Sequence, residues 1–291
     1  MQPVRPAGRE SSKGAFVAVA FEQKVAIIQF PGVNCEYETA RAVRALGIEA
    51  ELFRWNEDPH LLDSCLAVVL PGGFSYQDRI RAGVVAAKDR IMEKVSELAR
   101  DGRPVLGICN GAQVLVESGL IPGIHWERVD LALAPNIMED REGYFCTWVY
   151  LRNEGGPCMW TKTFDEGEVV PIPVAHAEGR FVTIDSAVLE EMRDRGQIAL
   201  SYCTASGVVE ERFPVNPNGS VLNIAGVCNR EGNVLAMMPH PERASWLRQV
   251  PEDISGAWGR RRIRASGNHT ELRGEGPGLG FFSSLAERGD R

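Results

Sequence analysis

The stretch PVLGICNGAQ at residues 104–113 constrains the fold of this chain more than any other segment. Residues 104–108 predict a short buried strand, and residues 110–118 have apolar positions at helical spacing. Cys109 lies between them in a Gly-x-Cys-x-Gly turn, the thiol counterpart of the Gly-x-Ser-x-Gly nucleophile elbow. Such a turn predicts a thiol above the carboxyl end of a sheet, at a helix N-terminus that favours the thiolate. The alternative is a structural cysteine in a glycine-containing turn between a strand and a helix.

Strand and helix patterns alternate through the first half of the chain. Apolar strands are expected at 24–30, 49–53 and 66–70, and helices at 36–46 and 84–100. Three strand–helix units in succession predict an α/β fold with an open, mostly parallel sheet flanked by helices. Ligands bind beyond the carboxyl ends of the strands in such sheets, and both Cys109 and the loop at Gly72-Gly73 fall there. This agreement favours a catalytic cysteine over a structural one.

The pattern changes after Gly123. Further strands are expected at 144–151, around 170–175, and at 208–209, 224–228 and 234–238, with short helices at 188–195 and 278–286. Residues 1–23 are expected to form a flexible tail, and residues 24–291 a single domain. Within that domain, residues 245–277 are polar and rich in Gly and Arg, which predicts a loop or an extended excursion.

Composition disfavours several classes of protein. The net charge of −7 disfavours broad nucleic-acid binding, and the basic cluster of Arg260, Arg261, Arg262 and Arg264 is expected to be a solvated face or a partner contact. Seven cysteines without a Cys-x-x-Cys pair, and no secretory signal pattern, indicate reduced thiols in a cytoplasmic protein. No apolar run reaches the roughly 20 residues of a membrane helix. Neither zinc-ligand spacing nor a Gly-x-x-x-x-Gly-Lys loop occurs, so neither a metal nor a nucleotide site is expected.

A cysteine nucleophile needs a base, and the base needs a group that orients it. Four of the five histidines head a His-x-Glu unit, and two of these units are weighed as the base with its orienting group: His176 with Glu178, and His240 with Glu242. Residues i and i+2 of an extended segment share a face, so each Glu can support its own His. His240 is favoured as the base because it follows an apolar strand end, where other site loops gather. The alternative for each unit is a polar surface turn.

Longer motifs resemble one family. GICNGAQ at 107–113 and PHPE at 239–242 resemble the class I, triad-type glutamine amidotransferases. Further matching stretches are QFPGVNCE at 29–36, LPGGFSY at 70–76 with RAG at 81–83, NPNGS at 216–220, IAGVCN at 224–229 and MMPHPER at 237–243. Together they resemble the PurQ family, the glutaminase subunits of phosphoribosylformylglycinamidine synthase, over residues 24–243.

The resemblance implies a flavodoxin-like sheet with additional antiparallel strands, and a Cys–His–Glu triad. Cys109 would attack the side-chain amide of glutamine, with His240 as acid and base and Glu242 orienting the imidazole. The backbone N–H groups of Gly73 and Asn110 would bind the oxyanion. The residues implied to line the glutamine pocket are Gln113, His176 and Glu178, with a structural role as the alternative for His176.

The resemblance also implies a reaction and partners. The chain would hydrolyse glutamine to glutamate and ammonia, and a synthetase subunit would use the ammonia to convert formylglycinamide ribonucleotide to formylglycinamidine ribonucleotide in purine biosynthesis. ATP and Mg²⁺ would be used by that synthetase, with no cofactor in this chain, and a small accessory subunit would complete the complex. Three alternatives stay open: a glutaminase of another synthetase, a catalytically silent regulatory subunit, and a cysteine peptidase. The Phe-Ser-Tyr and NPNGS stretches, the intact triad and the MPHPE ending argue against them in that order.

Overall fold

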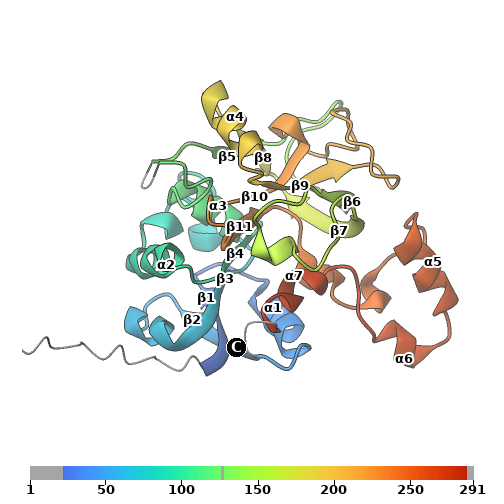
Figure 1. Cartoon of the computed structure of the whole chain (residues 1–291), viewed down its shortest axis with the longest axis horizontal. Helices are drawn as coiled ribbons and strands as arrows, with labels where there is room; N and C mark the ends of the chain where they lie inside the picture. The colour runs from blue at the N-terminus through green and yellow to red at the C-terminus, as the bar shows by residue number, and fades with distance from the viewer. Residues whose placement is uncertain (1–21, 126–127, 287–291) are drawn as a thin grey trace, which may run out of the picture.

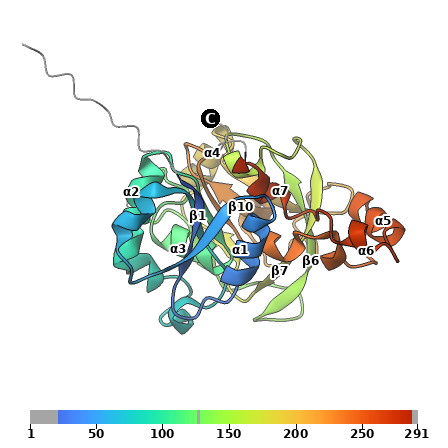
Figure 2. The ribbon, with the colours of Figure 1, turned by 90° about the horizontal axis from the view of Figure 1, so that it is seen from below.

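The computed structural model of the chain describes residues 22–125 and 128–286. Within these residues the central feature is a nine-stranded sheet in the order β2-β1-β3-β4-β11-β10-β9-β6-β7, with helices on both faces (Figures 1 and 2). The expected α/β fold, a parallel core with added antiparallel strands, is confirmed. Residues 1–21 of the expected tail lie outside the described residues, and the first strand begins at Glu22, two residues before the expected domain start.

Five strands form the parallel half of the sheet: β1 (Glu22–Gln29), β2 (Glu49–Arg54), β3 (Cys65–Leu70), β4 (Val105–Ile108) and β11 (Val234–Met237). All residues of β3, β4 and β11 are buried. A strand covered on both faces by helices has no solvent side, which explains why these three are continuous apolar runs rather than alternating ones.

Four antiparallel strands continue the sheet beyond β11: β10 (Ile224–Cys228), β9 (Ile198–Cys203), β6 (Phe145–Asn153) and β7 (Val169–His176). Each runs opposite to its neighbour, so β9 and β7 point the same way as the parallel strands. The carboxyl end of β7, at His176, therefore lies at the same edge as those of β4 and β11. A separate two-stranded sheet pairs β5 (Ala132–Ala134) with β8 (Arg180–Val182).

The helices that pack around the sheet are α1 (Glu36–Arg44), α2 (Arg90–Arg100), α3 (Asn110–Glu117), α4 (Ser186–Asp194) and α7 (Gly280–Ser283). In Figure 2, α1 and α2 lie on opposite sides of β1. Short 3₁₀ segments are η1 (Pro59–Ser64), η2 (Ser75–Asp78), η3 (Ala86–Lys88), η4 (Met159–Thr161), η5 (Val221–Asn223), η6 (Pro241–Ala244) and η7 (Leu247–Gln249). No helix in the described segments is both long and apolar enough to span a membrane.

Several sequence-based expectations differ from the structure. The helix expected from residue 84 begins at Arg90, because the Asp89 carboxylate accepts a hydrogen bond from Ile91 N at 3.3 Å and caps the helix there. The strand expected at 208–209 is absent: Thr204 N–H donates to Val208 O at 2.8 Å and closes a turn. The strand of this region is instead β9, which was not expected, and the final helix is shortened to α7.

Residues 245–277 also differ from the expected loop, because they contain two helices, α5 (Ala257–Arg264) and α6 (His269–Leu272). Figure 1 shows both helices standing away from the body of the molecule. The buried side chains of Leu247, Val250 and Ala265 form a small separate core here, with Trp258 and Leu272 packed against it. These apolar residues are spread through a polar stretch, and composition alone therefore hides a segment that packs on itself.

Candidate active site

Loops from distant parts of the chain meet at the carboxyl edge of the sheet. Cys109 follows β4, His240 follows β11, and Gly73 follows β3. One cavity is lined by all three of these residues. The expectation that the Gly72-Gly73 loop and the cysteine elbow fall at one edge is thus matched by the geometry.

The turn at Cys109 has the strained geometry of a nucleophile elbow. Its φ is 51° and its ψ −103°, a conformation that an L-residue adopts only under constraint. Cys109 N–H donates to Met237 O at 2.8 Å, which ties the elbow to β11. A Cβ on Gly107 would lie 2.6 Å from Gly111 O, and one on Gly111 would collide with Leu70 O. Both glycines are therefore required by close approach of backbone, as the sequence pattern predicts.

Two backbone N–H groups beside Cys109 have no acceptor among the described residues, those of Gly73 and Asn110. Asn110 is the first residue of α3, so its N–H is one of the donors that a helix leaves unpaired at its start. Gly73 has a φ of +145°, and a Cβ there would lie 2.5 Å from Val33 Cα. The pair is available to an incoming oxyanion, the role expected from the resemblance.

His240 and Glu242 form a buried pair. His240 Nδ1 and Glu242 Oε1 are 2.6 Å apart, and His240 N–H donates to Pro173 O of β7 at 2.8 Å. Burial alone lowers the pKa of His240, but the charges of Glu242 and Cys109 outweigh it and hold that pKa well above its ordinary value. The other ring nitrogen, Nε2, is buried and has no partner among the described residues. The Cys109 thiol itself donates a hydrogen bond to Ala175 O of β7 at 3.7 Å.

A second cysteine lies against the same histidine and was not expected from the sequence. Cys35 Sγ is 3.9 Å from His240 Nδ1, and ligand-type atoms of Cys35, His240 and Glu242 all lie within 4.8 Å of one another. The donor types suit a zinc ion, but the Arg243 guanidinium lies 3.2 Å from the Cys35 sulfur and opposes a cation there. Cys35 and Arg243 both occur in the motifs that carry the family resemblance, which is the signal that could have found them.

Two proteins that are similar to this chain carry the same name. A sequence profile described as the CobB/CobQ-like glutamine amidotransferase domain matches residues 22–264. The phosphoribosylformylglycinamidine synthase subunit PurQ of Methanothrix thermoacetophila is 45% identical over 269 residues, which are 90% of this chain and 96% of that one. The PurQ subunit of Pyrococcus furiosus is 46% identical over 222 residues, covering 76% of this chain and 89% of that one. This chain belongs to the PurQ family of glutamine amidotransferases.

Solved structures agree with the PurQ family assignment. The structure of PurLQS from Thermotoga maritima holds a chain that is 33% identical, with a TM-score of 0.62 over 85% of this chain and 98% of that one. The glutaminase domain of Trypanosoma brucei CTPS with bound acivicin has a TM-score of 0.50 at 14% identity, covering 91% of this chain and 94% of that one. The second likeness shows the fold alone.

The residues that the PurQ resemblance assigns to glutamine line a second cavity beside Cys109. Gln113, His176 and Glu178 all border it, together with Cys109 and Gly73. Gln113 is 5% exposed, and its amide donates to Glu178 O at 2.7 Å. The elbow helix and the loop after β7 are therefore joined across the floor of this cavity.

His176 is buried in a neutral form. Its Nδ1 lies 3.1 Å from Asn136 Oδ1, and the Asn136 amide donates to His176 O at 2.9 Å. Burial, and then the charge of His240, lower the pKa of His176 to about 3. Gly179 packs directly on the ring, where a Cβ would collide. The contacts fit a structural role as well as a role in lining the pocket.

Asp78 is a further carboxylate of this cavity that was not expected from the sequence. Burial, and then the negative charge of Glu178, raise the pKa of Asp78 to about 6. Its backbone has a φ of 51° and follows Tyr76 and Gln77 at 53° and 60°, so the whole loop is strained. The Asn110 amide, 3.3 Å from Asp78 Oδ1, holds the loop against the elbow helix. Asp78 and Glu178 therefore place two carboxylates at this cavity, and none of the described residues that line it is a Lys or Arg.

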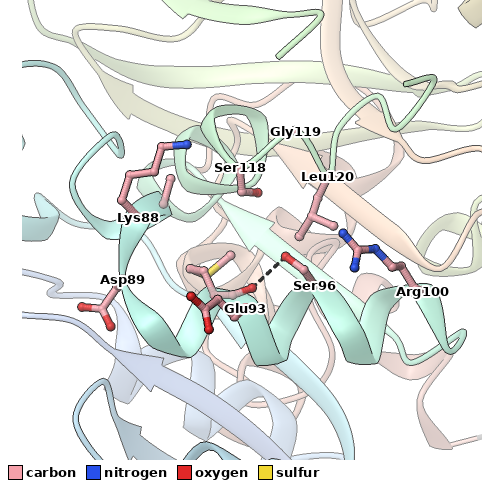
Figure 3. A pocket seen from close by; sticks show the side chains of 10 residues that line it. Lys88, Asp89, Glu93, Ser96, Arg100, Ser118, Gly119 and Leu120 are labelled. Atoms are coloured by element: carbon pink, nitrogen blue, oxygen red, sulfur yellow. Dashed lines mark hydrogen bonds between the residues drawn. The ribbon is translucent and has the colours of Figure 1, made fainter. Parts of the chain in front are cut away.

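A separate hollow lies between α2 and the end of α3 (Figure 3). Its walls mix both signs of charge, with Lys88, Glu93 and Arg100 among them. Ser96 Oγ in the same wall donates to Met92 O of its own helix at 2.7 Å. None of its lining residues borders the two cavities at Cys109.

Proposed function

We propose that this chain is the glutaminase subunit of a phosphoribosylformylglycinamidine synthase in purine biosynthesis. The observation that carries the proposal is Cys109 on a strained elbow beside a buried His240–Glu242 pair. The length of the matched relatives supports the specific assignment, since this chain covers 96% of the Methanothrix subunit. The whole of residues 24–291 acts as one amidotransferase domain in this proposal.

The first half of the reaction releases ammonia. The Cys109 sulfur attacks the side-chain amide carbon of glutamine, while His240 Nε2 holds the thiol proton. The oxyanion of the tetrahedral intermediate accepts hydrogen bonds from Gly73 N–H and Asn110 N–H. His240 then passes its proton to the leaving nitrogen, the C–N bond breaks, and a γ-glutamyl thioester remains on Cys109.

The second half of the reaction frees the enzyme. Neutral His240 takes a proton from water, and the resulting hydroxide attacks the thioester carbon. The C–S bond breaks, glutamate leaves, and the thiolate–imidazolium pair is restored. Glu242 keeps Nδ1 protonated throughout, so Nε2 is always the nitrogen that exchanges the proton.

Glutamine is held by the cavity that Gln113, His176 and Glu178 line. Its α-ammonium group carries the only positive charge of the substrate, and the carboxylates of Asp78 and Glu178 offer it a complementary site. The pocket therefore selects an amino acid over a plain amide by charge.

The ammonia goes to a synthetase subunit, with a small accessory subunit in the same complex, and the Thermotoga maritima PurLQS structure supports this partnership. ATP and Mg²⁺ are used by the synthetase, and this chain holds no cofactor of its own in the proposal. The chain works in the cytoplasm, in keeping with the free thiols of its seven cysteines.

The experiment that tests the function measures glutamate release with and without the synthetase, formylglycinamide ribonucleotide and ATP. Strong stimulation by the complete mixture is expected. Equal activity alone would indicate a glutaminase of another system, and activity in neither mixture would indicate a silent subunit.

Cys109→Ala is the variant that tests the nucleophile. It abolishes glutamine-dependent synthesis but leaves synthesis from added ammonium unchanged, because the synthetase still receives its nitrogen. Retained glutamine-dependent activity would refute the triad.

A further inference from the structure

One buried thiol contacts the triad without a part in the chemistry above. Cys35 is 1% exposed and stands directly before α1. Its sulfur lies 3.9 Å from His240 Nδ1, the nitrogen that already has Glu242 Oε1 at 2.6 Å. Cys35 therefore faces the oriented side of the imidazole rather than the nitrogen that exchanges protons with the nucleophile.

The backbone of Cys35 holds the peptide that carries an oxyanion donor. Asn34 N–H and Cys35 N–H both donate to Gly72 O, at 3.1 and 3.2 Å. The carbonyl of Gly72 and the N–H of Gly73 belong to one planar trans peptide group, so they point in opposite directions. Two donors on this carbonyl fix the direction of Gly73 N–H.

The space between these groups is filled. A Cβ on Gly72 would lie 2.7 Å from His240 Cε1 and 3.2 Å from Cys35 Sγ. The imidazole ring of His240 is thus in direct contact with the loop before α1 and with the loop after β3. A close-packed arrangement of this kind passes a shift of one group on to the others.

Arg243 lies between the Cys35 thiol and the Glu242 carboxylate. Its Nη2 lies 3.2 Å from Cys35 Sγ, and its Nε lies 3.9 Å from Glu242 Oε1. The thiol donates in turn to Asn34 Oδ1 at 3.3 Å. The sulfur accepts one hydrogen bond and donates another, and this fixes the guanidinium beside Glu242.

We propose that Cys35 is a positioning residue for glutamine hydrolysis. Its side chain sets the acid–base pair through Arg243 and the His240 ring, while its backbone N–H, which every variant at this position except proline keeps, holds the Gly72 peptide. The inference rests on the triad assigned under Proposed function. None of the contacts of Cys35 described above involves the residues assigned to hold glutamine, so its loss lowers kcat and leaves KM for glutamine unchanged.

The test compares Cys35→Ala with Cys203→Ala and Cys109→Ala in the complex with the synthetase. Cys203 is also buried, at 2% exposure, and borders neither cavity at Cys109. We expect Cys35→Ala to lower kcat for glutamine-dependent synthesis by about 10- to 100-fold, with KM for glutamine and synthesis from ammonium unchanged. Cys203→Ala keeps the original kcat, and Cys35→Ser recovers part of it because its hydroxyl still accepts from Arg243.

A kcat of Cys35→Ala equal to that of Cys203→Ala overturns the proposal. So does an equal loss of glutamine-driven and ammonium-driven synthesis, because that result shows a role in folding or assembly. If Cys35→Ala does not fold, Arg243→Gln decides, since that side chain is 41% exposed and its truncation leaves the core intact; the same loss of kcat supports the proposal and an unchanged kcat overturns it.

The Cys109→Ala reference separates this inference from the function itself. Inactive Cys109→Ala with fully active Cys35→Ala refutes the positioning role alone. Glutamine-dependent activity in Cys109→Ala, together with none in Cys35→Ala, makes Cys35 the nucleophile and refutes both.

Discussion

Glu242 Oε1 lies 2.6 Å from His240 Nδ1, and the two side chains are 0% and 3% exposed. Burial would favour the neutral imidazole, but the negative charges of Glu242 and Cys109 hold the proton on the ring and raise the pKa of His240. The imidazole ring therefore keeps its proton to higher pH than an ordinary histidine. A protonated His240 can serve as the acid for the leaving nitrogen in the proposed reaction.

Glu242→Gln tests, through the pH dependence of activity, whether Glu242 raises the pKa of His240. Removing the anion leaves burial as the main influence, so the pKa of His240 falls. The imidazolium is then lost at lower pH, and the alkaline limb of the kcat/KM profile for glutamine moves to lower pH. We also expect kcat/KM to fall roughly 100-fold or more at the optimum. An alkaline limb that stays in place, measured by glutamate release across pH, would contradict the assigned role.

Asp78→Asn tests recognition of the α-ammonium group. The change removes one of two carboxylates at the cavity, and we expect KM for glutamine to rise about tenfold, the loss of one charge-assisted hydrogen bond. Hydrolysis of glutaramate, which is glutamine without the α-amino group, stays unchanged. Asp194→Asn, on the exposed side of α4, is the matched control. An equal effect on both substrates would show that Asp78 supports the loop and does not bind the α-ammonium group.

His176→Gln tests the neutral buried histidine through stability. The pKa of His176 is about 3 in the folded chain and about 6.5 when unfolded, so below pH 6.5 the unfolded chain binds the extra proton. Folding stability due to this group is therefore lost as pH falls from 6.5 towards 3. Between pH 7 and pH 5 the unfolding free energy of the original chain should drop by about 2 kcal/mol more than that of the variant. Urea unfolding at the two pH values measures this, and equal drops would contradict a neutral buried ring.

Arg260→Glu with Arg264→Glu tests the projecting helices. Arg262 pairs with Glu252 at 3.0 Å and Arg261 lies over the Trp258 ring, which leaves Arg260 and Arg264 exposed on α5. If this segment contacts the synthetase, as its position suggests, reversing both charges weakens the complex about tenfold and reduces its salt dependence. Titration of the complex by fluorescence anisotropy gives both values. Unchanged affinity would remove α5 from the interface.

The elbow could be predicted from the sequence, because the residues that this turn requires lie close together along the chain. Gly107 and Gly111 stand where backbone passes at collision distance, and no other residue type fits. The contact of His240 with Glu242 was also expected, but it forms in a different way, because Glu242 lies in the 3₁₀ segment η6 and not on an extended segment. The same expectation fails at His176, whose Nδ1 faces Asn136 and not Glu178. The fold class followed from three strand–helix units in succession, a pattern that is also local in the sequence.

Some contacts between distant segments could not be predicted from the residues alone. Cys35 and His240 are 205 positions apart, and nothing in the local pattern of either indicates their approach. The role proposed for Asp78 depends on its position beside Glu178, which follows a different strand. The helices α5 and α6 were concealed by a polar composition, because their small core depends on a few scattered apolar residues.

The hydrogen bond from His240 N–H to Pro173 O ties the histidine to the edge of the sheet. Pro173 belongs to β7, which among the described residues has a strand neighbour on one side only. An edge strand that supplies no member of the proposed triad therefore helps to hold the backbone of its histidine in place.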